Sequence, residues 1–396
     1  MNHIKPEIGD KRVHIAIFAP SIGSEGNPLY WTGILLELAK RNFTTSVFTF
    51  DSIESPIEKN LVNFITIPHT SIKYKRIPIL WHLARILRYD NSEVYFVSEF
   101  SALSLTVILL AKFLQNKKTV LMVENHPEFL KPYGIFRDTP ARKAYRTIVC
   151  ALSDVIMTNN KRTSEYLTHE LHVQYRKIVT GPYLTSNFVT KSIRNMDLRN
   201  LRSERKIEIA CVGQFIERKG YLELIDTISK FGDDIRQKFS IHLYGKGPLL
   251  EKVRSKLESS GAHETIIIAG SFPYGELGGR LIKHDIMLIP TMGDYRSLVA
   301  FEALSIGLPI IISKYDGSSE EVLMPIGSTP INGYSYDPKD PDTLKSVLLR
   351  LINDTQLLYR LKIGARLLKE TYSTNRAGGV FADAYHLANG NFPNSD

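Results

Sequence analysis

Two carboxylates lie close together in the stretch "DIMLIPTMGDYRSLVAFEALSIGLPIIIS" (residues 285–313), which predicts a buried strand, a polar loop, a helix and a second buried strand. Asp294 lies just before the predicted helix and Glu302 lies inside it. An ionised carboxylate is a strong acceptor for two adjacent hydroxyl groups, and the free amides that open a helix can hold a diphosphate. Those amides belong to Ser297, Leu298 and Val299. The structural alternatives are a capping or loop charge for Asp294 and a solvent-facing helix residue for Glu302.

A second candidate phosphate site lies in "ACVGQFIERKGYLELIDTISKF" (residues 210–231), where Gly213 ends a predicted strand. Lys219 precedes a helix that is predicted to start at about Tyr221. A lysine beside a helix amino terminus favours phosphate, because the helix end carries partial positive charge and free N–H donors. A plain surface lysine is the alternative. The later stretch "HLYGKGPLLEKV" lacks the third glycine of the dinucleotide fingerprint, which disfavours a nicotinamide enzyme.

The elements that must position these residues follow a repeating pattern. Short strand-like runs such as "VHIAIFAP", "EVYFVS" and "KTVLMVEN" alternate with helical stretches in the first half, and "IEIACVG", "FSIHLYG", "IMLIP" and "PIIIS" do so in the second. This alternation predicts an α/β fold with parallel sheets covered by helices. The polar segment 191–206 is the predicted linker between two similar halves. A ligand is expected between them, at the carboxyl ends of the strands.

The composition fits a folded protein of two or three domains, since 396 residues with 43% hydrophobic content can bury a sizeable core. The apolar run 101–110 is too short to span a bilayer and residues 1–10 lack a signal-peptide core, so we expect a cytoplasmic protein. Cys150 and Cys211 are predicted to be buried thiols rather than a disulfide. No Cys/His spacing resembles a zinc site.

The positive charge of the chain lies in its first half. Residues 1–200 hold 26 Lys and Arg against 17 Asp and Glu, whereas the rest of the chain holds 24 against 24. Much of the excess lies in residues 71–90, where basic residues alternate with Trp81, Ile86, Leu87 and other apolar residues. The basic members are Lys73, Lys75, Arg76, Arg85 and Arg88. This pattern predicts a segment that lies on an anionic membrane; a solvated helix packed on its own domain is the alternative.

Five motifs occur in a characteristic order: "VGQFIERKGYLELI", "LYGKGPLLEKV", "IIIAGSFPYGEL", the acidic stretch described above, and "INGYSYDPKDPDTLKSVLLRLIND". Together they resemble the carboxyl-terminal domain of retaining GT-B glycosyltransferases of family four, over roughly residues 207–372. The resemblance of the first half is looser. It implies two Rossmann-like domains, 1–195 for the acceptor and 206–372 for the nucleotide sugar, with residues 373–396 crossing back to the first.

The resemblance also implies roles for single residues. Asp294 would contact the donor sugar and Glu302 the ribose hydroxyls. Lys219 would neutralise the diphosphate, and His126 would contact the donor from the first domain. The implied chemistry is sugar transfer with retention from a UDP- or GDP-sugar, with no cofactor and no obligatory metal. The further candidates for substrate contact are Gly23, Gly26, Gly213, Gln214, Ser271, Phe272, Arg296, Ser297, Leu298 and Val299.

Two positions depart from the family pattern. The first acidic residue is Asp294 where the family more often has glutamate, which shortens the reach toward the sugar. Gln214 stands where the family usually has an arginine that reaches the diphosphate. Lys219 would then carry more of that charge, or Arg296 would compensate for the missing arginine.

The leading function is therefore a glycosyltransferase of surface polysaccharide or glycolipid assembly, with a lipid-linked glycan acceptor and a place on the inner face of the cell membrane. One alternative keeps the fold but uses a soluble acceptor, or acts as a sugar-nucleotide epimerase. A non-enzyme alternative is a basic protein that binds anionic membrane or nucleic acid. Since no aromatic-basic RNA motif is present, we expect no nucleic-acid partner.

Overall fold

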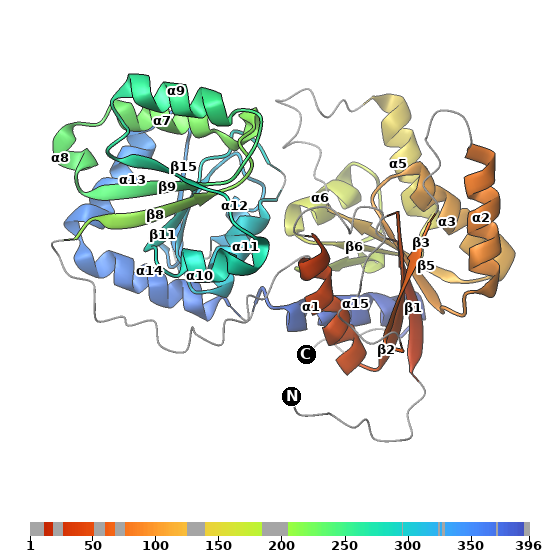
Figure 1. Cartoon of the computed structure of the whole chain (residues 1–396). Helices are drawn as coiled ribbons and strands as arrows, with labels where there is room; N and C mark the ends of the chain where they lie inside the picture. Colours follow the sequence, from red (N-terminus) through yellow and green to blue (C-terminus); the bar gives the residue numbers. More distant parts are fainter. Residues whose placement is uncertain are drawn as a thin grey trace. The chain divides into compact units, whose positions relative to one another are not determined.

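The structure, a computed structural model, describes residues 12–18, 27–50, 60–67, 76–124, 139–183, 205–294, 296–323, 325–326, 329–369 and 371–391. The chain divides into two compact units (Figure 1). The predicted linker falls almost entirely outside the described residues.

The first unit is built on a seven-stranded parallel sheet with the order β3-β2-β1-β4-β5-β6-β7. Its strands are β1 (Val13–Phe18), β2 (Phe43–Thr49), β3 (Val62–Thr66), β4 (Val94–Ser98), β5 (Lys118–Val123), β6 (Val155–Thr158) and β7 (Ile178–Thr180). The helices are α1 (Asn27–Lys40), α2 (Arg76–Tyr89), α3 (Ala102–Gln115), α5 (Pro140–Leu152) and α6 (Lys161–His169). Strands such as β4 and β6 are apolar along their length because helices cover both faces of the sheet.

The last helix, α15 (Thr374–Ala388), packs in this first unit although the preceding residues belong to the second. Phe381 anchors it, with its ring centroid 5.2 Å from Phe96 and 6.1 Å from Trp31. Gly181 makes the approach possible, since a Cβ at this position would lie 2.6 Å from a methyl group of Val380. Gly181, directly after β7, therefore leaves the space that α15 needs to pack on this unit.

The second unit has a six-stranded parallel sheet with the order β10-β9-β8-β11-β12-β15. Its strands are β8 (Ile207–Val212), β9 (Phe239–Tyr244), β10 (Ile266–Gly270), β11 (Ile286–Ile289), β12 (Ile310–Ser313) and β15 (Gly333–Tyr336). The main helices are α7 (Tyr221–Ser229), α9 (Leu250–Ser260), α11 (Leu298–Ser305), α13 (Pro341–Asn353) and α14 (Thr355–Leu367). The short helices are α8 (Asp233–Arg236), α10 (Leu277–Leu281) and α12 (Ser319–Val322), and β13 (Pro325–Ile326) pairs with β14 (Thr329–Pro330).

Both sheets reverse their strand order at one point, between β1 and β4 in the first unit and between β8 and β11 in the second. Loops that leave neighbouring strands in opposite directions open a crevice at such a point. In the second unit, Gly213 follows β8 and the segment 290–294 follows β11. The α/β prediction is confirmed. Gly213, Gln214 and Lys219 lie on the first of these loops and Asp294 lies on the second.

The two cysteines are buried and unbonded, as predicted. Cys211 lies on β8 within the core of the second unit, and burial raises the pKa of its thiol above the usual value. Cys150 lies on α5, where burial raises its pKa to about 12. Both thiols are therefore protonated packing residues at neutral pH.

Candidate functional site

The loop after β8 is joined to the loop after β11 through the backbone of Arg218. Its carbonyl oxygen accepts the Thr291 hydroxyl at 2.7 Å and the Met292 amide at 2.8 Å. Gly220 then allows α7 to start close to β11, because a Cβ here would lie 2.0 Å from the Pro290 carbonyl oxygen and its φ of +71° suits glycine. These contacts hold the residue between them, Lys219, against the second loop.

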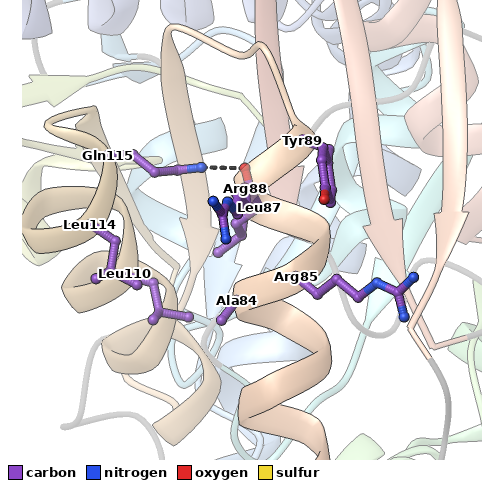
Figure 2. Close-up of a pocket in the computed structure, with 8 residues that line it drawn as sticks. All are labelled: Ala84, Arg85, Leu87, Arg88, Tyr89, Leu110, Leu114 and Gln115. Carbon is purple, nitrogen blue, oxygen red and sulfur yellow. Dashed lines mark hydrogen bonds between the residues drawn. The ribbon is translucent and has the colours of Figure 1, made fainter.

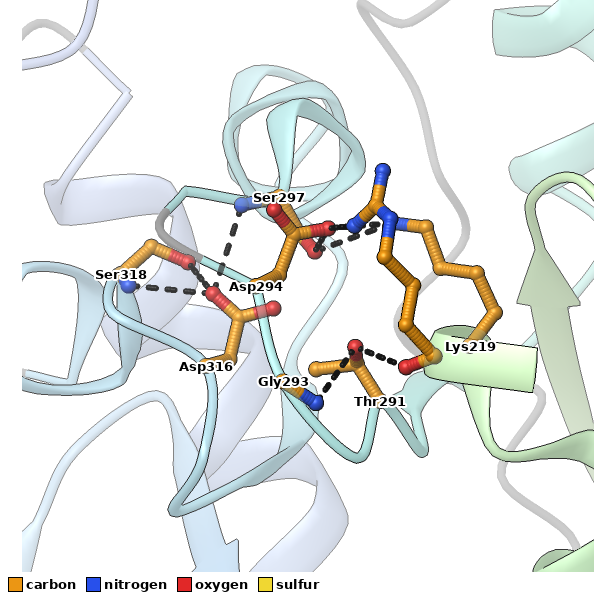
Figure 3. Close-up of polar contacts among 8 residues, drawn as sticks. Lys219, Thr291, Gly293, Asp294, Ser297, Asp316 and Ser318 are labelled. Carbon is orange, nitrogen blue, oxygen red and sulfur yellow. Dashed lines mark hydrogen bonds and ion pairs between the residues drawn. The ribbon is translucent and has the colours of Figure 1, made fainter. Parts of the chain in front are cut away.

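Lys219 and Asp294 form the centre of the site (Figure 3). The Lys219 Nζ donates to Asp294 Oδ2 at 2.8 Å, and it lies 3.4 Å from the Ser297 hydroxyl. The Arg218 guanidinium donates to the same Oδ2 atom. One buried carboxylate is therefore bound by two cations, while the side chains of Lys219 and Arg218 keep 17% and 31% of their surface exposed. Their remaining N–H donors are available to an anion that arrives from solvent.

Asp294 is ionised in this arrangement. Burial alone would raise its pKa, but the charges and hydrogen bonds of Lys219 and Arg218 outweigh that effect and hold the pKa of Asp294 below its usual value. The carboxylate then serves to keep both cations in place. Its backbone is fixed as well, since the Asp294 amide donates to the Tyr315 carbonyl at 3.2 Å and its carbonyl accepts from Gly317 at 2.8 Å.

A second buried carboxyl, Asp316, lies beside this cluster on the loop after β12 (Figure 3). Its Oδ1 atom accepts from the Ser297 amide at 3.3 Å, and from the amide and hydroxyl of Ser318 at 3.0 and 2.5 Å. Its Oδ2 atom is buried without a hydrogen-bond partner. Burial raises the pKa of Asp316, and the neighbouring charge of Asp294 raises it further. The pKa of Asp294 is therefore lowered and the pKa of Asp316 is raised. These opposite shifts favour one negative charge on the pair over two.

The start of α11 differs in one respect from the expectation. The Ser297 amide already donates to Asp316, so it is not free for a phosphate. Ser297 also turns its hydroxyl toward Asp294 Oδ2 at 3.4 Å instead of capping the helix. The amides of Leu298 and Val299 remain in the first turn, where a helix has no carbonyl partners of its own for its N–H groups.

Glu302 lies on α11 and is only 6% exposed, so it is not the solvent-facing residue of the structural alternative. Its neighbours Phe301 and Ala303 belong to the apolar core of the unit. Glutamate is rarely buried in a core helix without a functional or structural partner. This burial is what a carboxylate that receives hydroxyl groups from a ligand would need.

Arg296 forms a buried ion pair. Its Nε and guanidinium nitrogen donate to the two carboxylate oxygens of Glu321 at 3.1 and 3.0 Å, and its Cζ atom lies 3.7 Å from the centre of the Phe301 ring. The side chain is 1% exposed. Arg296 therefore joins α12 to α11, and the expectation that it would compensate for Gln214 at a diphosphate is not supported by this geometry.

The other candidates are dispersed. Gly213 follows β8 directly and Gln214 next to it is exposed. Ser271 is exposed after β10, while the Phe272 ring packs 5.2 Å from Tyr244. Gly23, Gly26 and His126 lie outside the described residues. Arg218 and Asp316 were not predicted as site residues. The adjacent pair "RK" before Gly220 is the sequence signal that could have indicated Arg218.

The described His, Cys, Asp and Glu side chains can be searched for a metal-binding cluster. Among the described residues, no group of three or more His, Cys, Asp or Glu side chains could hold a metal ion. The expectation of metal-independent chemistry remains a prediction. Likewise, none of the helices that the structure describes combines the length and hydrophobicity needed to cross a bilayer.

The two Rossmann-like sheets define the GT-B fold. Residues 193–367, a little less than half of the chain, match the sequence model of the family Glycosyl transferases group 1, and this part of the chain is similar to that family. The predicted resemblance to GT-B glycosyltransferases is thus confirmed, while the assignment to family four and the retention of configuration stay predictions.

Several known proteins are similar to this chain in sequence or in fold. An uncharacterized glycosyltransferase of Methanocaldococcus jannaschii is 26% identical over 37% of this chain and 38% of its own length. The chain spans less than half the length of this relative and of a second one from the same organism. The structure of Anabaena HepE in complex with UDP has a TM-score of 0.69 at 13% identity, covering 95% of this chain and 99% of that one. The lipopolysaccharide outer core galactosyltransferase WaaB has a TM-score of 0.66 at 15% identity, covering 94% and 99%.

Proposed function

We propose that this protein transfers a sugar from a nucleoside-diphosphate sugar to a glycan or lipid-linked acceptor. The observation that carries the proposal is the Lys219–Arg218–Asp294 cluster at the strand-order reversal of the second unit. Lys219, which is partly exposed beside the first turn of α11, suits the diphosphate of such a donor. The match of residues 193–367 to the sequence model of the glycosyl transferases group 1 supports the same activity.

The chemistry depends on the leaving diphosphate. As the bond between the anomeric carbon and the phosphate oxygen breaks, negative charge develops on that oxygen, and Lys219 is placed to stabilise it. The acceptor hydroxyl oxygen forms the new bond on the same face of the sugar, so the configuration is retained. Its proton passes to the leaving phosphate. In this proposal no metal ion is required, because Lys219 and the first turn of α11 stabilise the leaving diphosphate.

Glu302 is proposed to accept the ribose hydroxyls, and Asp294 to lie next to the transferred sugar. Buried carboxylates bind such hydroxyls strongly, since water does not compete there. A panel of UDP- and GDP-sugars in a thermal-shift assay tests the donor class. A ligand at about 100 times its dissociation constant stabilises the fold by about 2.7 kcal/mol. If no member of the panel shifts the melting temperature, the proposed function fails.

Glu302→Gln is expected to weaken binding of the stabilising donor by about tenfold to a hundredfold, because a charge-assisted hydrogen bond contributes about 1.5 to 3 kcal/mol. Isothermal titration with that donor measures the change. Glu258→Gln, an exposed position on α9, is the matched control and should bind normally. Donor affinity equal to that of the control would show that Glu302 does not bind the ribose.

The acceptor is proposed to be lipid-linked, at the cytoplasmic face of a membrane, because of a surface on the first unit. This α2–α3 surface consists of Arg85, Arg88, Tyr89, Phe113 and Leu114. Tyr89, Phe113 and Leu114 are 76%, 74% and 68% exposed, and both arginines are exposed. Large apolar side chains beside arginines, with no carboxylate among them, match an anionic lipid surface.

A groove of about 670 Å³ runs along this surface between the two helices. Leu110 and Leu114 of α3 lie on one side of it, and Ala84 and Arg88 of α2 on the other (Figure 2). The apolar part of the surface differs from the sequence expectation. Leu87 is buried in the core of the first unit and is not available to a membrane. The α3 residues supply the exposed apolar side chains instead.

Arg85→Gln combined with Arg88→Gln is expected to weaken binding to anionic vesicles about 30-fold, since each basic residue near such a surface contributes about 1 kcal/mol. Sedimentation with phosphatidylglycerol vesicles at low and physiological salt measures the effect. Lys252→Gln combined with Arg254→Gln removes the same charge from an exposed stretch of α9 and serves as the control. Equal binding by both double variants would remove the α2–α3 surface from the proposal and favour a soluble acceptor.

A further inference from the structure

Arg218 has the position and chemistry of a second phosphate-binding cation. Its guanidinium meets the same Asp294 oxygen as Lys219 and keeps 31% of its side chain exposed. Gln214, at the start of the same loop, is exposed and carries no charge. The loop after β8 therefore offers its two neighbouring cations, Arg218 and Lys219, beside α11.

We propose that Arg218 binds the diphosphate of the donor together with Lys219, and that Asp294 holds both cations in place until the donor arrives. This inference rests on the proposed function and assigns a binding role to a residue outside the acidic motif. The guanidinium group suits the task because its planar fork of N–H donors matches phosphate oxygens two at a time.

The backbone contacts of Arg218 support a fixed position. Its carbonyl oxygen holds Thr291 and Met292, so the base of the side chain cannot move away from the loop after β11. Arg218 is preorganised because its backbone is fixed and its guanidinium group is paired with Asp294. An anion that binds to this guanidinium therefore avoids the entropic cost of ordering the side chain.

The charge balance of the cluster also favours an anion. Arg218 and Lys219 supply two positive charges against one carboxylate, Asp294, with which both are in contact. The neighbouring Asp316 has a raised pKa, which reduces its own share of negative charge. An excess of positive charge remains at a partly exposed position, where a diphosphate can neutralise it.

The alternative is that Arg218 is only a structural ion pair that joins the two loops. A structural role predicts a lower melting temperature for Arg218→Met without a change in anion binding. The two roles therefore differ in a measurement of binding, not of stability.

The experiment titrates the full-length protein with UDP, GDP and inorganic pyrophosphate by calorimetry. Arg218→Met is expected to lower the affinity for the nucleotide that binds, and for pyrophosphate, by about tenfold. Arg218→Lys, which keeps the charge, should recover part of this loss. Arg254→Met, an exposed position on α9, is the control and should bind as the wild type does.

Unchanged pyrophosphate affinity in Arg218→Met would overturn the inference, whatever its melting temperature. A loss that Arg218→Lys does not recover would also overturn it, because charge would then not be the cause. If the wild-type protein binds none of the three probes, the proposed function itself fails. The two failures are therefore distinguishable.

Discussion

Replacing Lys219 with alanine is expected to lower the rate of sugar transfer about a thousandfold at saturating donor, which corresponds to about 4 kcal/mol of barrier. The ammonium group is held beside the diphosphate position by Asp294 and Ser297, and the residue directly after Gly213 is the uncharged Gln214. Stabilisation of developing charge by a preorganised donor in a partly buried site is the largest single effect such an enzyme can use.

Steady-state rates with the donor identified by thermal shift measure this effect. Lys252→Ala, on the exposed side of α9, is the matched control and should keep full activity. The folded state should persist in Lys219→Ala because Arg218 still pairs with Asp294. A decrease of less than about tenfold, or about 1.4 kcal/mol, would show that Lys219 is not the main stabiliser of the leaving group.

Much of the second unit could be predicted from the sequence because its signals are local. The stretch 285–313 alternates between a short apolar run, a polar loop and a helical pattern, and the structure places β11, α11 and β12 there. Buried β-branched runs bounded by glycine and charged residues predict parallel strands wherever helices lie between them. The position of Lys219 before a helix followed from the glycine next to it.

The contacts within the site could not be predicted in the same way. The pair of Arg296 with Glu321 joins residues on two different elements, and nothing near Arg296 in the sequence indicates a partner. Asp316 belongs to a stretch, "SKYDGSS", that is typical of an ordinary turn, and its role depends on where the end of β12 meets Asp294. Such pairings depend on the order of the strands in the sheet, and local sequence patterns do not specify that order.

In the first unit, the contacts of the basic segment 71–90 could likewise not be predicted from its local sequence pattern. Its charges and apolar residues predict an amphipathic helix, and α2 covers the described part of it. The pattern does not say whether the apolar face meets a membrane or the sheet. Leu83 and Leu87 pack in the core, whereas Phe113 and Leu114 of α3 are left exposed. Only the packing of α2 against α3 reveals which side chains remain available.

Asp294→Asn is expected to lower the free energy of unfolding of the second unit by about 1.5 to 3 kcal/mol at neutral pH, because it removes the carboxylate that two partly exposed cations share. Hydrogen–deuterium exchange of peptides from β8, β11 and β12 measures this locally. The folded-state pKa of Asp294 is depressed, so its contribution is present above the unfolded pKa of about 3.9 and is lost as the pH falls through the folded value.

The difference between wild type and Asp294→Asn should therefore be constant near neutrality and shrink below about pH 4. Asp316→Asn serves as the control, because its effect on stability should change with pH in the opposite direction. The pKa of Asp316 is raised, so the stability that its neutral form supports is present at low pH and is lost as the pH rises through the folded value. Asp316→Asn should thus gain stability relative to wild type as the pH rises. Two variants with parallel pH dependences would contradict the charge assignment of this pair, because only opposite shifts of the two carboxyl groups produce opposite slopes.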